Sequence, residues 1–161
     1  MDRRAGFTLI ELLITIIVMV ILVTLAVVSL RGNQQHARDE KRKSDVAAIA
    51  QQLESYYTTG SDPISTYAAG EYPPTILMDT EVEVKAALRD LDPKALRAPD
   101  VGTAAPMSFT VATTTTEPTP NVSTYVYMPL TIDNTLCQNS AQECRKFILY
   151  YALEGTGGIQ K

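Results

Sequence analysis

The most constraining feature of the sequence is an apolar run near the amino terminus that holds a single charge. Residues 7–30 read FTLIELLITIIVMVILVTLAVVSL, and Glu11 is the one charged side chain among them. As a helix this run reaches roughly 36 Å, which exceeds a hydrocarbon core of roughly 30 Å. It is longer than the apolar core of a secretory signal peptide, and no small-residue cleavage site follows it. We therefore expect residues 7–30 to form a retained membrane-spanning helix.

The basic residues on either side of this run bear on its orientation. Arg3 and Arg4 precede it, which favours an amino terminus in the cytoplasm and a chain that continues outside after Leu30. A twin-arginine export signal is another reading of the same pair. A second basic group follows the run and argues the other way. Its members are Arg31, Arg38, Lys41, Arg42 and Lys43.

Glu11 has two readings in such a helix. An ionised carboxylate in a membrane-spanning segment costs several kcal/mol unless a cation neutralises it. In one reading, Glu11 lies near the membrane interface and its side chain reaches water. In the other, the compensating cation belongs to another molecule.

The composition excludes several classes of protein. With one histidine and two cysteines, the chain has little material for a zinc cluster or a histidine-dependent catalytic triad. The net charge of -4 argues against a nucleic-acid binder with a basic surface, although exposed tyrosines leave base stacking open. We expect a protein that is not an enzyme and that holds no metal or cofactor. His36 is expected to be an exposed helix residue.

The segment around Glu11 resembles a known signal. Residues 3–13, RRAGFTLIELL, combine a basic leader ending in Gly6, the aromatic Phe7, an apolar stretch and a glutamate at the fifth position after the glycine. This pattern is similar to the class III signal of type IV pilins and of the pseudopilins of type II secretion systems. The resemblance implies that a prepilin peptidase cleaves between Gly6 and Phe7 and that the new amine of Phe7 is methylated. It also implies that Glu11 neutralises the Phe7 amine of a neighbouring subunit during filament assembly.

A long helix is expected beyond the membrane. Many type IV pilins carry a proline about where Val28 stands, but no proline interrupts this chain up to Thr59, so we expect one continuous helix from Phe7 to Tyr57 that ends at Gly60. Its second half is amphipathic. The apolar stripe on that half consists of Val46, Ile49, Leu53, Tyr56 and Tyr57.

Charged residues precede this stripe. Asp39 with Lys43 and Lys41 with Asp45 are four residues apart, a spacing that brings side chains together on a helix surface. We expect a solvated helix face there, with a contact between subunits or with lipid head groups as the alternatives.

The remaining sequence predicts a small α+β domain. Residues 79–91 are expected to form a short helix capped by Thr80, with the acidic residues of its first turn acting as capping charges rather than a cation site. Strands are expected at 107–112, 123–132 and 146–153, in an antiparallel sheet that covers the stripe of the long helix. The resemblance implies the same architecture.

Two surface features of this domain stand out. The only cysteines, Cys137 and Cys144, lie in a domain expected outside the cytoplasm, where disulfides persist, so we expect them to pair, with two free thiols as the alternative. The resemblance agrees, because a disulfide near the carboxyl end is common in pilins. Residues 113–120, TTTTEPTP, are expected to form an exposed hairpin loop. The sequon at residues 121–123 and the threonine run leave glycosylation open.

The expected organisation has four parts. Residues 1–6 are a leader, 7–30 the helix half that spans the membrane and then forms the filament core, 31–58 the amphipathic half, and 59–161 the head domain. By resemblance, the chain starts as a single-pass protein of the cytoplasmic membrane, in contact with lipid, and ends in an extracellular filament. Its partners would be copies of itself, other pilins, the prepilin peptidase and an inner-membrane assembly platform.

Three functions are compatible with these features. The favoured one is the structural subunit of a type IV pilus that serves adhesion, twitching motility or DNA uptake. Pseudopilins of type II secretion systems are the alternative, and these tend to have a calcium-binding loop near the end and usually lack a disulfide there. The third is an anchored binding module that never polymerises, for which Glu11 has no evident partner.

The processing signal gives a first testable prediction. Mass spectrometry of the mature protein from its own cells should find Phe7 as the first residue, with one methyl group on its amine. An intact Met1, or a cut at another position, would refute the resemblance.

Overall fold

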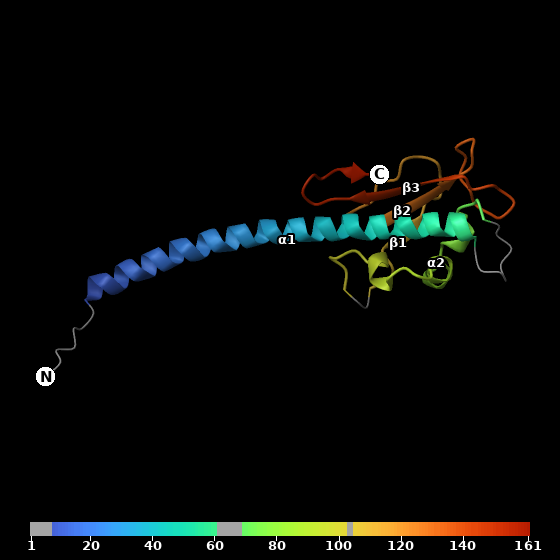
Figure 1. The fold of residues 1–161 in the computed structure, drawn as a ribbon. Coiled ribbons are helices and arrows are strands. Elements are labelled where there is room, and N and C mark those ends of the chain that lie inside the picture. Colours follow the sequence, from blue (N-terminus) through green and yellow to red (C-terminus); the bar gives the residue numbers. More distant parts are fainter. Residues whose placement is uncertain (1–7, 61–68, 103–104) are drawn as a thin grey trace. The chain divides into compact units, whose positions relative to one another are not determined.

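The amino-terminal half of the structure is one long helix. The computed structural model describes residues 8–60, 69–102 and 105–161, in two compact units that meet between residues 37 and 38. Helix α1 (Leu9–Thr59, 51 residues) passes through Val28 and Gly32 without a break, which confirms the expected continuity (Figure 1). Gly60 ends it with φ 75°, and its N–H donates to the carbonyl of Tyr56 at 2.8 Å.

The apolar stripe of α1 is covered as predicted. Ile49 and Leu53 have no exposed surface, Tyr56 is buried, and Val46 and Tyr57 are half-buried. Ile49 and Leu53 share one core with side chains of the sheet. Within the unit formed by residues 38–161, the carboxy-terminal part of α1 lies along the sheet (Figure 1). The sheet residues of this core are Phe109, Tyr125, Tyr127 and Leu149.

The sheet has four strands in the order β1-β2-β3-β4. The first three, β1 (Phe109–Val111), β2 (Tyr125–Leu130) and β3 (Lys146–Ala152), lie within the predicted strand segments. The prediction missed β4 (Ile159–Gln160), which pairs antiparallel with the end of β3. Helix α1 and this small sheet make the α+β fold that the sequence predicts.

The predicted antiparallel arrangement is wrong for one pair of strands. β2 and β3 are antiparallel, whereas β1 and β2 are parallel, with Phe109 opposite Tyr125. Parallel neighbours need a crossover of about a dozen residues, and residues 112–124 supply it. The threonine-rich segment is therefore part of a crossover and not a hairpin loop. Residues 113–117 are exposed, as expected.

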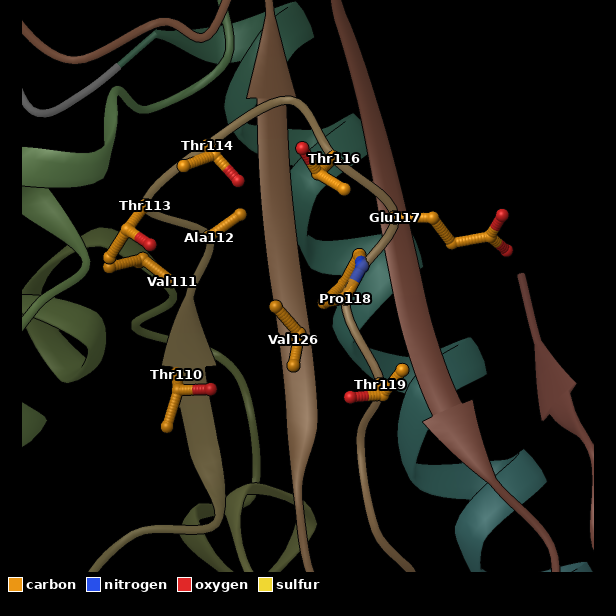
Figure 2. A pocket seen from close by; sticks show the side chains of 10 residues that line it. All are labelled: Thr110, Val111, Ala112, Thr113, Thr114, Thr116, Glu117, Pro118, Thr119 and Val126. Carbon is orange, nitrogen blue, oxygen red and sulfur yellow. The ribbon is translucent and has the colours of Figure 1, made fainter.

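Strand β2 is buried on both faces. Tyr125 and Tyr127 belong to the core shared with α1, whereas Val126, Met128 and Leu130 belong to a second cluster. Figure 2 shows the crossover passing in front of β2, with α1 behind the sheet. The crossover thus lies on the face of the sheet that α1 leaves uncovered.

Short helices connect α1 to the sheet. They are the 3₁₀ turn η1 (Thr75–Leu77), helix α2 (Glu81–Ala87) and the 3₁₀ turn η2 (Pro93–Leu96). Helix α2 is shorter than predicted but is capped at the predicted residue. The Thr80 hydroxyl accepts the N–H of Glu83, and the Glu83 carboxylate accepts the N–H of Thr80.

This capping box gives a second prediction. Replacing Thr80 by alanine should lower the free energy of unfolding by about 1 kcal/mol, because the first turn of α2 loses an acceptor for its N–H groups. Urea denaturation of the full chain in detergent measures the loss. Thr114→Ala is the control, because Thr114 is an exposed threonine outside any helix. Equal stability of the two variants would contradict the prediction.

Candidate functional site

The amino-terminal part of α1 presents apolar side chains to its surroundings. Its large hydrophobic residues from Leu9 to Val27 are between 43% and 84% exposed. Glu11 is exposed in the first turn, where its backbone N–H donates to the Thr8 hydroxyl at 3.3 Å. Among the described residues, the Glu11 carboxylate contacts no hydrogen-bond or ion-pair partner. Its predicted pairing with the Phe7 amine of another subunit stays a prediction.

Two other expectations concern this segment. Gly6 and Phe7, the predicted cleavage and methylation site, lie outside the described residues. A search of the described helical residues finds no segment that is both long enough and apolar enough to count as a membrane span.

A cluster of charged side chains joins α1 to the head domain. We call it the Arg42 cluster. The Arg42 side chain has no exposed surface, and it pairs with Asp39, Asp100 and Glu154 at 2.9, 3.1 and 2.8 Å. Its Nε donates to the carbonyl of Val122 at 2.7 Å. The cluster consists of Arg38, Asp39, Arg42, Asp100 and Glu154.

The carboxylates of this cluster have further partners. Glu154 accepts from Nε and Nη2 of Arg38 at 2.8 and 2.6 Å, a bidentate pair. Asp39 accepts the backbone N–H groups of Glu154 and Gly155, both at 2.9 Å. Asp100 also accepts from the Ser123 hydroxyl. Three separate segments of the head therefore meet slightly more than one turn of α1.

These contacts shift the acidity of two carboxylates. The hydrogen bonds from Arg38, followed by those from Arg42, lower the pKa of Glu154 to about 2 against the effect of its partial burial. Burial alone would raise the pKa of Asp39. The two backbone N–H groups and Arg42 outweigh that effect and lower it. Both groups are thus held in their charged form.

A second buried carboxylate lies one turn further along α1. Asp45 is 2% exposed, pairs with Lys41 and accepts a hydrogen bond from the Tyr125 hydroxyl at 3.3 Å. Burial raises the pKa of Asp45, and the hydrogen bonds from Lys41 and Tyr125 oppose that rise only in part. Asp45 therefore fixes a β2 side chain to α1.

The prediction of a fully solvated charged face on α1 is wrong. Lys41 does pair with Asp45 as the spacing suggests, but Asp45, Asp39 and Arg42 are buried. Lys43 pairs with Glu40 rather than with Asp39. The cause is tertiary, because loops from the head supply partners that no spacing within the helix reveals. His36 is exposed, as expected.

The predicted disulfide between Cys137 and Cys144 is present, with both residues buried and their Cα atoms 5.7 Å apart. The loop that it closes is joined to the segment following α1. Tyr72 and Thr75 donate their N–H groups to the carbonyls of Cys144 and Cys137 at 2.9 and 3.0 Å. The disulfide therefore fixes the junction between the long helix and the sheet.

The crossover forms one side of a shallow pocket on the outer face of the sheet. Its volume is about 360 Å³, and Figure 2 shows that its wall contains the exposed threonines of residues 113–116 and Glu117 beside Val126. Elsewhere, Glu81 pairs with Lys85 and Arg97, and Glu83 serves the cap of α2. Among the described residues, no group of three or more potential ligands is placed to hold a metal ion.

Comparison with known proteins bears on the amino-terminal segment. The family model described as the prokaryotic N-terminal methylation motif matches residues 1–27. Together with the curated relatives given below, this match decides the family. The chain is a member of the type IV pilin and pseudopilin family. Its prepilin signal implies anchoring in a membrane followed by assembly into a filament, and the family is structural rather than enzymatic.

The curated relatives of this pilin-family chain carry one name. It is 39% identical to the type II secretion system core protein G of Dickeya chrysanthemi over 54 residues, which are 34% of this chain and 35% of that protein. The protein of the same name from Aeromonas hydrophila is 39% identical over 54 residues, 34% and 38% of the two chains. That from Escherichia coli (strain K12) is 36% identical over 55 residues, again 34% and 38%.

These matches span little more than a third of each relative's length. No solved structure matches the chain significantly. The details of the head domain, including the Arg42 cluster and the disulfide loop, therefore come from the structure of this chain itself.

The position of Glu154 gives a third prediction. Its folded-state pKa of about 2 lies below the ordinary 4.5, so its stabilising effect is full above pH 4.5 and is lost as the pH falls through 2. The groups that face it are Arg38 and Arg42, with Asp39 bound to its backbone N–H. Urea denaturation of the full chain in detergent between pH 5 and pH 2 should show a smaller loss of stability for Glu154→Gln than for the wild type.

Glu143→Gln is the matched control, because Glu143 is exposed and pairs with Arg145 on the surface. Its stability should follow that of the wild type through the same pH range. Identical pH profiles for Glu154→Gln and the wild type would contradict the assignment.

Proposed function

We propose that the chain is a pseudopilin, a structural subunit of the filament of a type II secretion system. The observation that carries the proposal is the similarity to proteins named type II secretion system core protein G in several bacteria. It favours this function over the type IV pilus, which the disulfide and the lack of an acidic loop favour in the sequence. The subunit acts by assembly and catalyses no reaction.

The features of α1 support such a role. Cleavage before Phe7 would leave a helix whose first turns carry exposed apolar side chains and one carboxylate, that of Glu11. Copies of this helix can bury that apolar surface against one another. The Phe7 amine of a neighbouring copy would then neutralise Glu11, so the charge favours one axial position of the docked subunit. The partners are copies of this chain, other pseudopilins and the prepilin peptidase.

A type IV pilus subunit is the second candidate. The observation that favours it is the disulfide between Cys137 and Cys144, which resembles the framed carboxy-terminal region of pilins. Filaments of that kind extend from the cell surface, whereas a pseudopilus stays short and serves export. The two candidates therefore differ in what a mutant cell loses.

The fourth prediction separates these functions in the organism that encodes the chain. Deleting the gene should stop the export of type II substrates into the medium, and no long surface fibres should contain the chain. Wild-type protein and Glu40→Leu should restore export, because Glu40 is an exposed carboxylate paired with Lys43 outside the apolar segment. Glu11→Leu should be inserted in the membrane but should not restore export.

Three outcomes would contradict these assignments. Normal export after deletion, together with the loss of surface fibres that contain the chain, would assign it to a pilus. Unchanged export and the absence of fibres in the wild type would refute both filament functions. Full activity of Glu11→Leu would refute the role of Glu11 in assembly.

A further inference from the structure

We propose that Asp39, Arg42, Asp100 and Glu154 form a register lock, which selects one axial and rotational position of α1 on the head domain. The lock concerns the subunit itself. Its consequence for the filament, a fixed orientation of each head on its own helix, rests on the proposed function.

The apolar stripe of α1 alone does not define a unique position. Its residues recur at intervals of three and four, so a shift of one turn, about 5.4 Å, brings one apolar side chain close to the place of the next. Val46 would approach the place of Ile49 or of Arg42, and Ile49 would approach the place of Leu53. Cores tolerate such exchanges of hydrophobic side chains if the total volume is kept, and lose uniqueness before they lose stability.

The charged residues discriminate against a shift in either direction. A shift of four residues one way places Val46 where Arg42 was and Lys43 where Asp39 was. Asp100 and Glu154 then lose a cation, and a second cation faces the N–H groups that Asp39 accepted. Partly buried carboxylates without partners carry a large desolvation cost.

A shift the other way is closer to being satisfied but still fails. Arg38 would take the place of Arg42, and the neutral Gln35 would take the place of Asp39. The N–H groups of Glu154 and Gly155, now both bound to one carboxylate, would lose their charged acceptor. The bidentate pair between Arg38 and Glu154 would also be lost. Only the observed position satisfies all of these groups.

The geometry of Arg42 suits a role in specificity. Each of its three side-chain nitrogens has an acceptor, and these acceptors come from α1 and from three loops of the head. Taking a guanidinium and its carboxylates out of water costs several kcal/mol per ion, so such clusters often add little net stability compared with apolar replacements. The lock is therefore expected to govern the uniqueness of the position more than the stability.

The fifth prediction separates uniqueness from stability in the full chain, purified in detergent. Spin labels on cysteines at Ser44 and Ser140 report the axial position of α1, because both residues are exposed and the disulfide loop lies near the carboxy-terminal end of α1 (Figure 1). The wild type should give a single narrow distance. The neutral triple variant Asp39→Asn, Arg42→Met, Glu154→Gln should add a second population displaced by up to about 5 Å.

Stability is measured on the same proteins as the urea midpoint. The single variant Arg42→Met should lower the midpoint strongly, because it leaves three carboxylates without their cation. The triple variant should recover most of that loss, since Asp100 is the only carboxylate left and is 27% exposed. Lys43→Met, which removes an exposed cation on the same helix, is the control and should change neither measurement.

A conservative variant tests the lock if the triple variant does not fold. Arg42→Lys keeps the charge but can reach fewer of the four acceptors at once, so it should fold and still show the second distance. A single narrow distance in every variant that folds would overturn the proposal, whatever the midpoints are. Because no filament is involved, this result is independent of the secretion experiment.

Discussion

The burial of one guanidinium organises the part of the structure that begins at residue 38. Arg42 has no exposed surface, and its charge is compensated by carboxylates of α1, of the segment after η2 and of the turn after β3. The chain cannot leave these groups apart without exposing a buried charge to an apolar surrounding. The position of the head loops and that of the helix are therefore set by the same electrostatic requirement.

Other contacts extend this arrangement toward the carboxy-terminal end of α1. Asp45 binds Tyr125 of β2, Glu54 accepts from the Tyr72 hydroxyl at 3.0 Å, and the disulfide loop binds the segment that follows the helix. Apolar packing through Ile49 and Leu53 lies between these polar contacts. The helix thus alternates polar contacts, which define position, with apolar ones, which supply most of the buried surface.

Local patterns in the sequence predicted much of this fold. The lack of proline predicted the continuous helix, Thr80 and Glu83 predicted the cap of α2, and the spacing of apolar residues predicted the buried stripe. The parallel pairing of β1 with β2 was not predictable, because it depends on the path of the crossover. Strand β4 was missed because two residues show no alternation. The Arg42 cluster was missed because charged residues on a helix are normally solvated, and its partners are more than fifty residues away along the chain.

The placement of the cluster also bears on how the subunit responds to force. Asp39 and Arg42 lie within the first five residues of α1 that belong to the compact unit of residues 38–161. A pull on the helix along its axis, toward Leu9, runs parallel to the interface and loads the bonds to Glu154, Gly155 and Asp100 together. Contacts loaded in shear share the tension instead of breaking one after another. The subunit is thus best braced in the direction in which a growing filament would pull it.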